Sequence, residues 1–221
     1  MQLVIPEVLP RAAALELGRE LTGADWVDGN VTSGEGAALA KRNRQLPEAS
    51  AAGAKGRRIV QQALAVSPLF LSAALPRAIY PPLFNRYGPG DGFRAHIDNA
   101  IRIDPASGQQ LRTDLSATLF LSEDYDGGDL VIAGGIGQRL GAGDMLLYPA
   151  TSIHHVSEVT RGTRICCFFW IESLVRDGGA RDILFDLDQS VQALTADRGG
   201  DDSEVLRLTG VYHNLVRRWS S

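Results

Sequence analysis

Between residues 78 and 174, short apolar segments alternate with turns rich in glycine and proline. This pattern predicts an extended segment at 79–87 and strands at 115–121, 129–132, 138–140, 144–148, 152–156 and 163–171. Several short strands spaced roughly ten residues apart, with such punctuation, are typical of a β-sandwich or jelly roll. The middle of the chain is therefore predicted to form a β core.

Helical patterns lie on both sides of this β core. Before it, an alanine- and leucine-rich stretch runs to about Leu21, and 58–75 has helical composition that Pro68 divides into two pieces. After it, 181–195 carries an amphipathic stripe and a last helix begins at Ser203. We therefore expect an N-terminal helical region at 1–77, the β core at 78–174 and a C-terminal helical extension at 175–221. The C-terminal helices pack either on the core or on a second copy of the chain, which would make a homo-oligomer.

Composition restricts the class of protein. The 221 residues are 44% hydrophobic and 22% charged, which is ordinary for a globular domain. A net charge of −4 argues against nucleic acid as a partner, and no apolar run reaches the roughly 18 residues of a membrane span. The first residues do not resemble a signal peptide. Cys166 and Cys167 are adjacent, so a disulfide between them is not expected, and we predict a cytoplasmic protein.

The candidate chemistry begins with a His-x-Asp triplet, His96 and Asp98. In an extended backbone, residues two apart point to the same side, so both can reach one metal ion. A second histidine would complete the two-histidine, one-carboxylate triad of non-haem Fe(II) oxygenases. The sequence offers His154, His155 and His213. Because the first two are consecutive on a predicted strand, at most one of them can face the triplet.

Arg164 is the second candidate, because it lies on an otherwise apolar strand. A guanidinium there is costly unless it meets an anion, and a carboxylate-bearing cosubstrate would supply one in a bidentate pair. An internal salt bridge to an aspartate or glutamate explains the same pattern, and from the residues alone it is the more common outcome.

Several longer motifs surround these residues. They occupy residues 87–100, 112–121, 125–130, 143–149, 152–164 and the C-terminal stretch 208–219. Together they resemble the PKHD-type hydroxylase family of Fe(II)/2-oxoglutarate-dependent dioxygenases, with a prolyl 4-hydroxylase-like core. The resemblance covers nearly the whole chain. It implies a double-stranded β-helix (jelly-roll) core within a mainly β fold with flanking α-helices.

The resemblance also implies site residues. The family places its distal histidine ten residues before the basic residue that binds 2-oxoglutarate, which selects His154 over His155 relative to Arg164. Fe(II) would then be held by His96, Asp98 and His154. Tyr87 stands where related hydroxylases carry a tyrosine near the cosubstrate, although a buried core tyrosine is an equal alternative.

The implied reaction is hydroxylation of an unidentified peptidyl or small-molecule substrate, using O2 and releasing succinate and CO2, with L-ascorbate (vitamin C) as the expected reductant. Candidate substrate or pocket contacts are Arg112, Thr118, Asn99 and the polar cluster 41–45, for which composition alone favours a solvated loop. Two other functions share some of these features. One is a metal-binding module without catalysis, and the other is a zinc hydrolase, which would have no use for Arg164.

Overall fold

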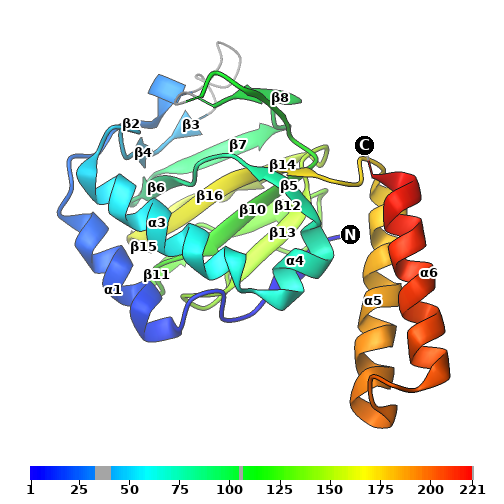
Figure 1. Cartoon of the computed structure of the whole chain (residues 1–221). Helices are drawn as coiled ribbons and strands as arrows, with labels where there is room; N and C mark the ends of the chain where they lie inside the picture. Colours follow the sequence, from blue (N-terminus) through cyan, green and yellow to red (C-terminus); the bar gives the residue numbers. More distant parts are fainter. Residues whose placement is uncertain (33–40, 105–106, 221) are drawn as a thin grey trace.

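The computed structural model describes residues 1–32, 41–104 and 107–220. Its largest element is an eight-stranded antiparallel sheet (Figure 1). In spatial order its strands are β1 (Leu3–Ile5), β13 (Met145–Pro149), β10 (Leu115–Phe120), β16 (Arg164–Ser173), β6 (Leu83–Tyr87), β4 (Arg44–Gln45) and β2 (Val27–Asp28), and β5 (Pro76–Ile79) also pairs with β16. This sheet is the scaffold on which the other elements pack.

A second sheet of four antiparallel strands faces the first. Its order is β12 (Leu130–Ile132), β14 (His154–Val156), β7 (Gly92–His96) and β3 (Lys41–Arg42). Two-stranded ribbons complete the β structure: β8 (Ile101–Ile103) with β9 (Gln110–Arg112), and β11 (Tyr125–Gly127) with β15 (Val159–Gly162). The predicted mainly β architecture with flanking helices is therefore confirmed.

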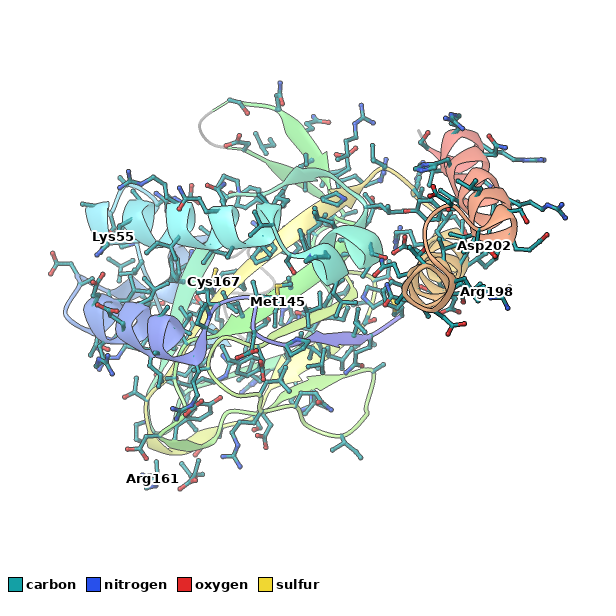
Figure 2. The ribbon with its side chains drawn as sticks, turned by 60° about the horizontal axis from the view of Figure 1, so that its bottom comes forward. Lys55, Met145, Arg161, Cys167, Arg198 and Asp202 are labelled. Carbon is teal, nitrogen blue, oxygen red and sulfur yellow. The ribbon has the colours of Figure 1, made fainter. Side chains whose placement is uncertain are left out.

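Three helices cover the outer face of the large sheet: α1 (Arg11–Thr22), α3 (Ala51–Ala65) and α4 (Pro68–Ala74) (Figure 1). The main apolar core lies in this layer, where Figure 2 labels Met145 and Cys167 on the sheet. The helices approach closely because they carry glycine at the contacts. A Cβ on Gly18 would lie 2.2 Å from the backbone oxygen of Leu121, and one on Gly56 would lie 2.7 Å from the Phe84 ring.

The strand β16 has both faces buried. Its odd-numbered residues, such as Cys167 and Phe169, pack in the helix-covered core, while Cys166 belongs to a second cluster that includes Phe120, Leu146 and Val156. A strand buried on both sides reads as a continuous apolar run rather than an alternating one. Arg164 opens this strand, so its charged side chain is placed in the interior.

The chain ends in a helical hairpin, α5 (Gly178–Arg198) and α6 (Ser203–Trp219), which stands at one side of the β structure (Figure 1). Figure 2 labels Arg198 and Asp202 at its turn. Leu184 is fully buried in a small cluster with Leu75 and Val175, so α5 packs on the core of its own chain. Packing against a second copy remains a prediction. No helix in the described residues is both long and apolar enough to cross a membrane.

Several local predictions were wrong. Residues 41–45 form the short strands β3 and β4 instead of a solvated loop, because Lys41, Asn43 and Gln45 point inward while Arg42 and Arg44 are exposed. The helical region predicted for 1–77 therefore also contributes strands to both sheets.

Element boundaries also differed from the sequence pattern. The helix expected from residue 58 begins at Ala51, because the side chain of Ser50 accepts a hydrogen bond from the backbone N–H of Gly53. Gly92–His96 forms the strand β7, which the pattern of apolar and polar residues did not predict. The strand predicted at 138–140 is reduced to a single bridge between Gln138 and Leu130.

Candidate metal and cosubstrate site

Three side chains able to bind a metal converge between the two sheets. His96 ends β7, Asp98 follows it by two residues, and His154 begins β14 directly opposite His96 in the antiparallel pairing. One ligand atom from each residue lies within 4.8 Å of the other two. The centroids of the two imidazole rings are 4.2 Å apart, and His154 Nε2 lies 3.9 Å from Asp98 Oδ2. Strand pairing thus assembles a three-ligand cluster.

Both imidazoles are held in the tautomer that suits a metal ligand. The Nδ1 atom of His96 lies 2.9 Å from the carbonyl oxygen of Arg94, and that of His154 lies 3.0 Å from the carbonyl oxygen of Ser152. A carbonyl oxygen only accepts, so each Nδ1 must carry the hydrogen and donate it. The Nε2 lone pair of each ring is then available to a cation.

The carboxylate of Asp98 is also fixed in place. Ser116, on the inner face of β10, donates a hydrogen bond of 2.5 Å to its Oδ2 atom. His154 is 5% exposed, and the ring of Tyr148 packs edge-on against it with centroids 5.1 Å apart. Burial, reinforced by the neighbouring His154, lowers the pKa of His96 and so favours its neutral, metal-binding form. Two imidazoles and one oriented carboxylate match the donor set of non-haem Fe(II) sites.

The other two histidines stand apart from this cluster. His155 is half-buried and paired in register with Val131, so strand alternation directs its side chain away from the His154 side. His213 is exposed on α6 with its ring near that of Tyr212. Within the described residues, the structure therefore brings together His96, Asp98 and His154.

Arg164 lies deep between the sheets with 1% of its surface exposed. Its Nη1 atom donates to the Sγ atom of Cys166 at 2.9 Å, whereas Nε and Nη2 are buried with no hydrogen-bond partner in the described structure. No described carboxylate pairs with it, so the internal salt bridge is not found. Two orphaned N–H groups on one edge of a guanidinium have the geometry of a bidentate carboxylate site.

Tyr87 and Gly128 shape the space around Arg164. Tyr87 lies opposite Arg164 in the pairing of β6 with β16, is 2% exposed, and its ring centroid lies 5.2 Å from the guanidinium carbon. Gly128 adopts a φ of +65°, and a Cβ there would lie 2.9 Å from Arg164 Cδ. Because glycine has no Cβ, the backbone of residue 128 can pass close to Arg164 and still leave room for the arginine side chain.

Arg161, the other basic residue near this end of β16, lies in a different environment. Its exposed side chain donates to Asp126 at 2.6 Å and to Asp124 at 2.9 Å (Figure 2). Its side chain is therefore solvated, and its charge is already paired.

Comparison with known proteins decides the family. The chain is 55% identical over its full length to a PKHD-type hydroxylase of Rhizorhabdus wittichii and 56% identical to one of Caulobacter vibrioides, in each case covering 99% of the relative. The chain belongs to the PKHD-type hydroxylases. Residues 82–172 match the 2OG-Fe(II) oxygenase superfamily, and residues 178–221 match the PKHD-type hydroxylase C-terminal domain. It is thus a hydroxylase with a 2-oxoglutarate- and Fe(II)-dependent oxygenase domain, and the family implies Fe(II), 2-oxoglutarate and O2.

Solved structures agree on the fold of this hydroxylase. A Pseudomonas putida prolyl-4-hydroxylase matches with a TM-score of 0.53 at 20% identity, covering 78% of this chain and 92% of the other. HygX from Streptomyces hygroscopicus, solved with nickel and 2-oxoglutarate, matches with a TM-score of 0.53 at 17% identity, covering 76% and 81%. The predicted jelly-roll fold is therefore confirmed.

The remaining predicted residues of the hydroxylase fall in different places. Thr118 is 5% exposed on β10, opposite Phe168 of β16. Asn99 is exposed, and its carbonyl oxygen accepts from Thr113. Arg112 donates to the carboxylate of Asp114 and to the carbonyl of Ser173, at the crevice beside the C-terminal hairpin. Its guanidinium is engaged in this network, and a substrate role for it stays a prediction.

Sequence reasoning missed several residues near the cluster. Ser116 shares a strand face with Thr118, so its position was predictable, but its bond to Asp98 was not. Tyr148 and Arg102 were not singled out at all. Tyr148 looked like an ordinary apolar strand residue, and Arg102 gave no sequence signal that distinguishes it from a solvated arginine.

Proposed function

We propose that His96, Asp98 and His154 hold the Fe(II) of this oxygenase. The observation that carries the proposal is their convergence, with both Nδ1 atoms donating to backbone carbonyls and the carboxylate oriented by Ser116. Iron bound there supplies the oxidising chemistry of the family, with O2 as the oxidant. The protein would contribute these three side chains as ligands, a donor set that suits non-haem Fe(II) oxygenases.

Arg164 binds the far carboxylate of 2-oxoglutarate. Its orphaned Nε and Nη2 atoms offer two parallel donors, and its side chain is enclosed by the rings of Tyr87 and Phe120, each 5.2 Å from the guanidinium carbon. A charge in so dry a place interacts strongly with an opposite charge. The Tyr87 hydroxyl is a second donor for the same carboxylate. Thr118, buried on β10 two residues after Ser116, is our candidate for a further pocket contact.

Substrate hydroxylation also requires that the ligand cluster be shielded from water. Tyr148, 4% exposed, and Phe93, whose ring stacks on His96 with centroids 3.7 Å apart, exclude water from one side of the ligand cluster. L-ascorbate serves as the reductant that keeps the iron in its ferrous state. A cytoplasmic location is supported by Cys166 and Cys167, which are both buried free thiols.

The test is anaerobic addition of Fe(II) and 2-oxoglutarate to the protein, followed by visible absorption spectroscopy. A metal-to-cosubstrate charge-transfer band is expected. His154→Ala should abolish the band, while the matched variant His155→Ala should retain it, because only the first side chain reaches the cluster. Loss of the band in both variants, or in neither, would refute the ligand assignment. Adding ascorbate during aerobic turnover should prolong succinate release, and no change would remove ascorbate from the proposal.

A further inference from the structure

Two cations, Lys41 and Arg102, lie inside or at the mouth of the space between the sheets. Lys41 on β3 is 6% exposed, and its ammonium donates to the carbonyl oxygen of Gly29 at 2.9 Å and to Gln45 Oε1 at 3.1 Å. An ammonium has three N–H donors, so one remains available. Arg102 on β8 is half-buried, and its Nε atom is buried without a hydrogen-bond partner in the described structure.

Aromatic rings connect both cations to the candidate metal cluster. The Lys41 ammonium lies 5.6 Å from the ring centroid of Phe93, which stacks on His96, and 5.9 Å from that of Phe168. The guanidinium carbon of Arg102 lies 3.7 Å from the ring centroid of Trp170. The rings of Phe168 and Trp170 meet edge to face with centroids 5.5 Å apart. The cations and rings therefore line one continuous wall that begins at a candidate iron ligand.

Within the described residues, the acidic groups near this wall lie too far from the two cations to form salt bridges with them. In the described part of the chain, neither Lys41 nor Arg102 forms an ion pair. Burial, followed by the positive charge of Arg102, lowers the pKa of Lys41 to about 8. Cys166 and Asp28 act on the pKa of Lys41 in the opposite sense. Tyr80, Asp98 and Glu48 act in that sense on the pKa of Arg102, but burial outweighs them. Aromatic faces stabilise a cation only modestly, by about 0.5–2 kcal/mol, so an anion between the two would be favoured.

We propose that Lys41 and Arg102 form the substrate-binding site of this hydroxylase and that they recognise a carboxylate on the substrate. Phe93, Phe168 and Trp170 form an apolar wall that holds the flat or apolar part of the same molecule. The inference rests on the proposed iron site, because a substrate bound along this wall can react only if its reacting carbon is directed to His96, Asp98 and His154. It is separate from the cosubstrate site, because the 2-oxoglutarate carboxylate is assigned to Arg164.

The test uses two probes of equal size, benzoate and benzamide, which differ in charge. The full-length protein is loaded with Mn(II), which does not turn over, and with saturating 2-oxoglutarate so that Arg164 is covered. Binding of each probe is measured by isothermal titration calorimetry. We expect the dissociation constant of benzoate to be at least about ten-fold lower than that of benzamide. A hydrogen bond that involves a charged group typically changes affinity by at least this factor.

Variants locate the probe. Lys41→Met and Arg102→Gln should each weaken benzoate binding by about ten-fold and leave benzamide binding within about two-fold. Lys55→Gln removes a positive charge from the outer face of α3, where Lys55 pairs with Glu20, and should change neither (Figure 2). Two independent variants keep the test valid if one of them folds poorly.

Other outcomes would overturn the inference. Equal binding of benzoate and benzamide, or benzoate binding unchanged in both variants, would remove the carboxylate site. Displacement of 2-oxoglutarate by benzoate, or loss of 2-oxoglutarate binding in Lys41→Met, would assign the cations to the cosubstrate instead. In those cases the proposed iron site would stand. If the parent protein bound neither Mn(II) nor 2-oxoglutarate, the proposed function itself would fail, and the inference with it.

Discussion

Ser116 on β10 donates a hydrogen bond of 2.5 Å to the Oδ2 atom of Asp98, which follows β7 in the opposite sheet. The bond joins the two sheets at the candidate metal cluster and fixes the carboxylate orientation. Removing such an outer partner of a metal ligand commonly costs about 10–100-fold in metal affinity. We therefore expect Ser116→Ala to weaken Fe(II) binding by that factor, measured by anaerobic titration.

The matched control for this change is Ser72→Ala. Ser72 donates a bond of the same 2.5 Å length to Asp188, between α4 and α5. Its loss should lower the free energy of unfolding by about 1 kcal/mol and leave Fe(II) affinity unchanged. Equal Fe(II) affinity in the Ser116 variant and the parent protein would mean that Asp98 is oriented by other contacts.

Replacing Arg164 with lysine keeps the positive charge but removes the two parallel N–H donors of the guanidinium. Its unpaired Nε and Nη2 atoms can address both oxygens of a carboxylate, whereas an ammonium meets them as a point charge. We expect Arg164→Lys to raise the dissociation constant for 2-oxoglutarate at least about ten-fold. Arg161→Lys, at an exposed and already paired arginine, should leave it unchanged. An unaltered constant in the first variant would remove Arg164 from the cosubstrate site.

Substitution of Gly128 tests whether 2-oxoglutarate binding depends on the position of the Arg164 side chain as well as on its presence. An alanine Cβ would lie 2.9 Å from Arg164 Cδ and from Val159 Cγ2, so the arginine must shift. Gly128→Ala should therefore weaken 2-oxoglutarate binding. Gly134→Ala is the control, because Gly134 has a similar positive φ of +72° with no atom within 4 Å of the added Cβ. Similar losses of 2-oxoglutarate affinity in both variants would attribute the effect to backbone strain alone.

Much of the fold follows from local pattern. The strand that carries Arg164 was predicted within two residues of its observed ends, because its apolar run is bounded by Gly162 and by a polar tail. The helix break at Pro68 was also predicted, because proline is tolerated at the first turn of a helix and not in its interior. Short strands such as β3 and β7 were missed. Their pairing partners are distant in the sequence, and the glycine-rich composition before His96 resembles a loop.

The candidate site, like the fold, could be predicted only in part from the sequence. Strand alternation shows that only one of His154 and His155 can face His96, but the choice between them required the spacing to Arg164 seen in the family. The stacking of Arg102 on Trp170 could not be predicted, because it depends on how the β8–β9 ribbon lies over β16. Contacts between elements far apart in sequence are set by tertiary packing, and no window of residues encodes them.

Lys41 makes the stability of the protein depend on pH in the alkaline range. Its pKa is lowered from 10.5 to about 8, chiefly by burial, so between these values the unfolded chain binds more protons than the folded one. The free energy of unfolding should therefore rise with pH from about 8 to about 10.5, by at most about 3 kcal/mol. Urea denaturation of the parent protein and of Lys41→Met across this pH range measures the change in the free energy of unfolding. A slope with pH that is the same in both proteins would contradict the prediction.

The C-terminal hairpin should depend on one leucine for its attachment to the core. Leu184 of α5 is fully buried against Leu75 and Val175, whereas its neighbour Ile183 is 55% exposed. Leu184→Ala should lower the free energy of unfolding by about 2–4 kcal/mol because it leaves a cavity. Ile183→Ala should change it by no more than about 0.5 kcal/mol. Urea denaturation compares the two, and equal small effects would mean that the hairpin is not held by this contact in solution.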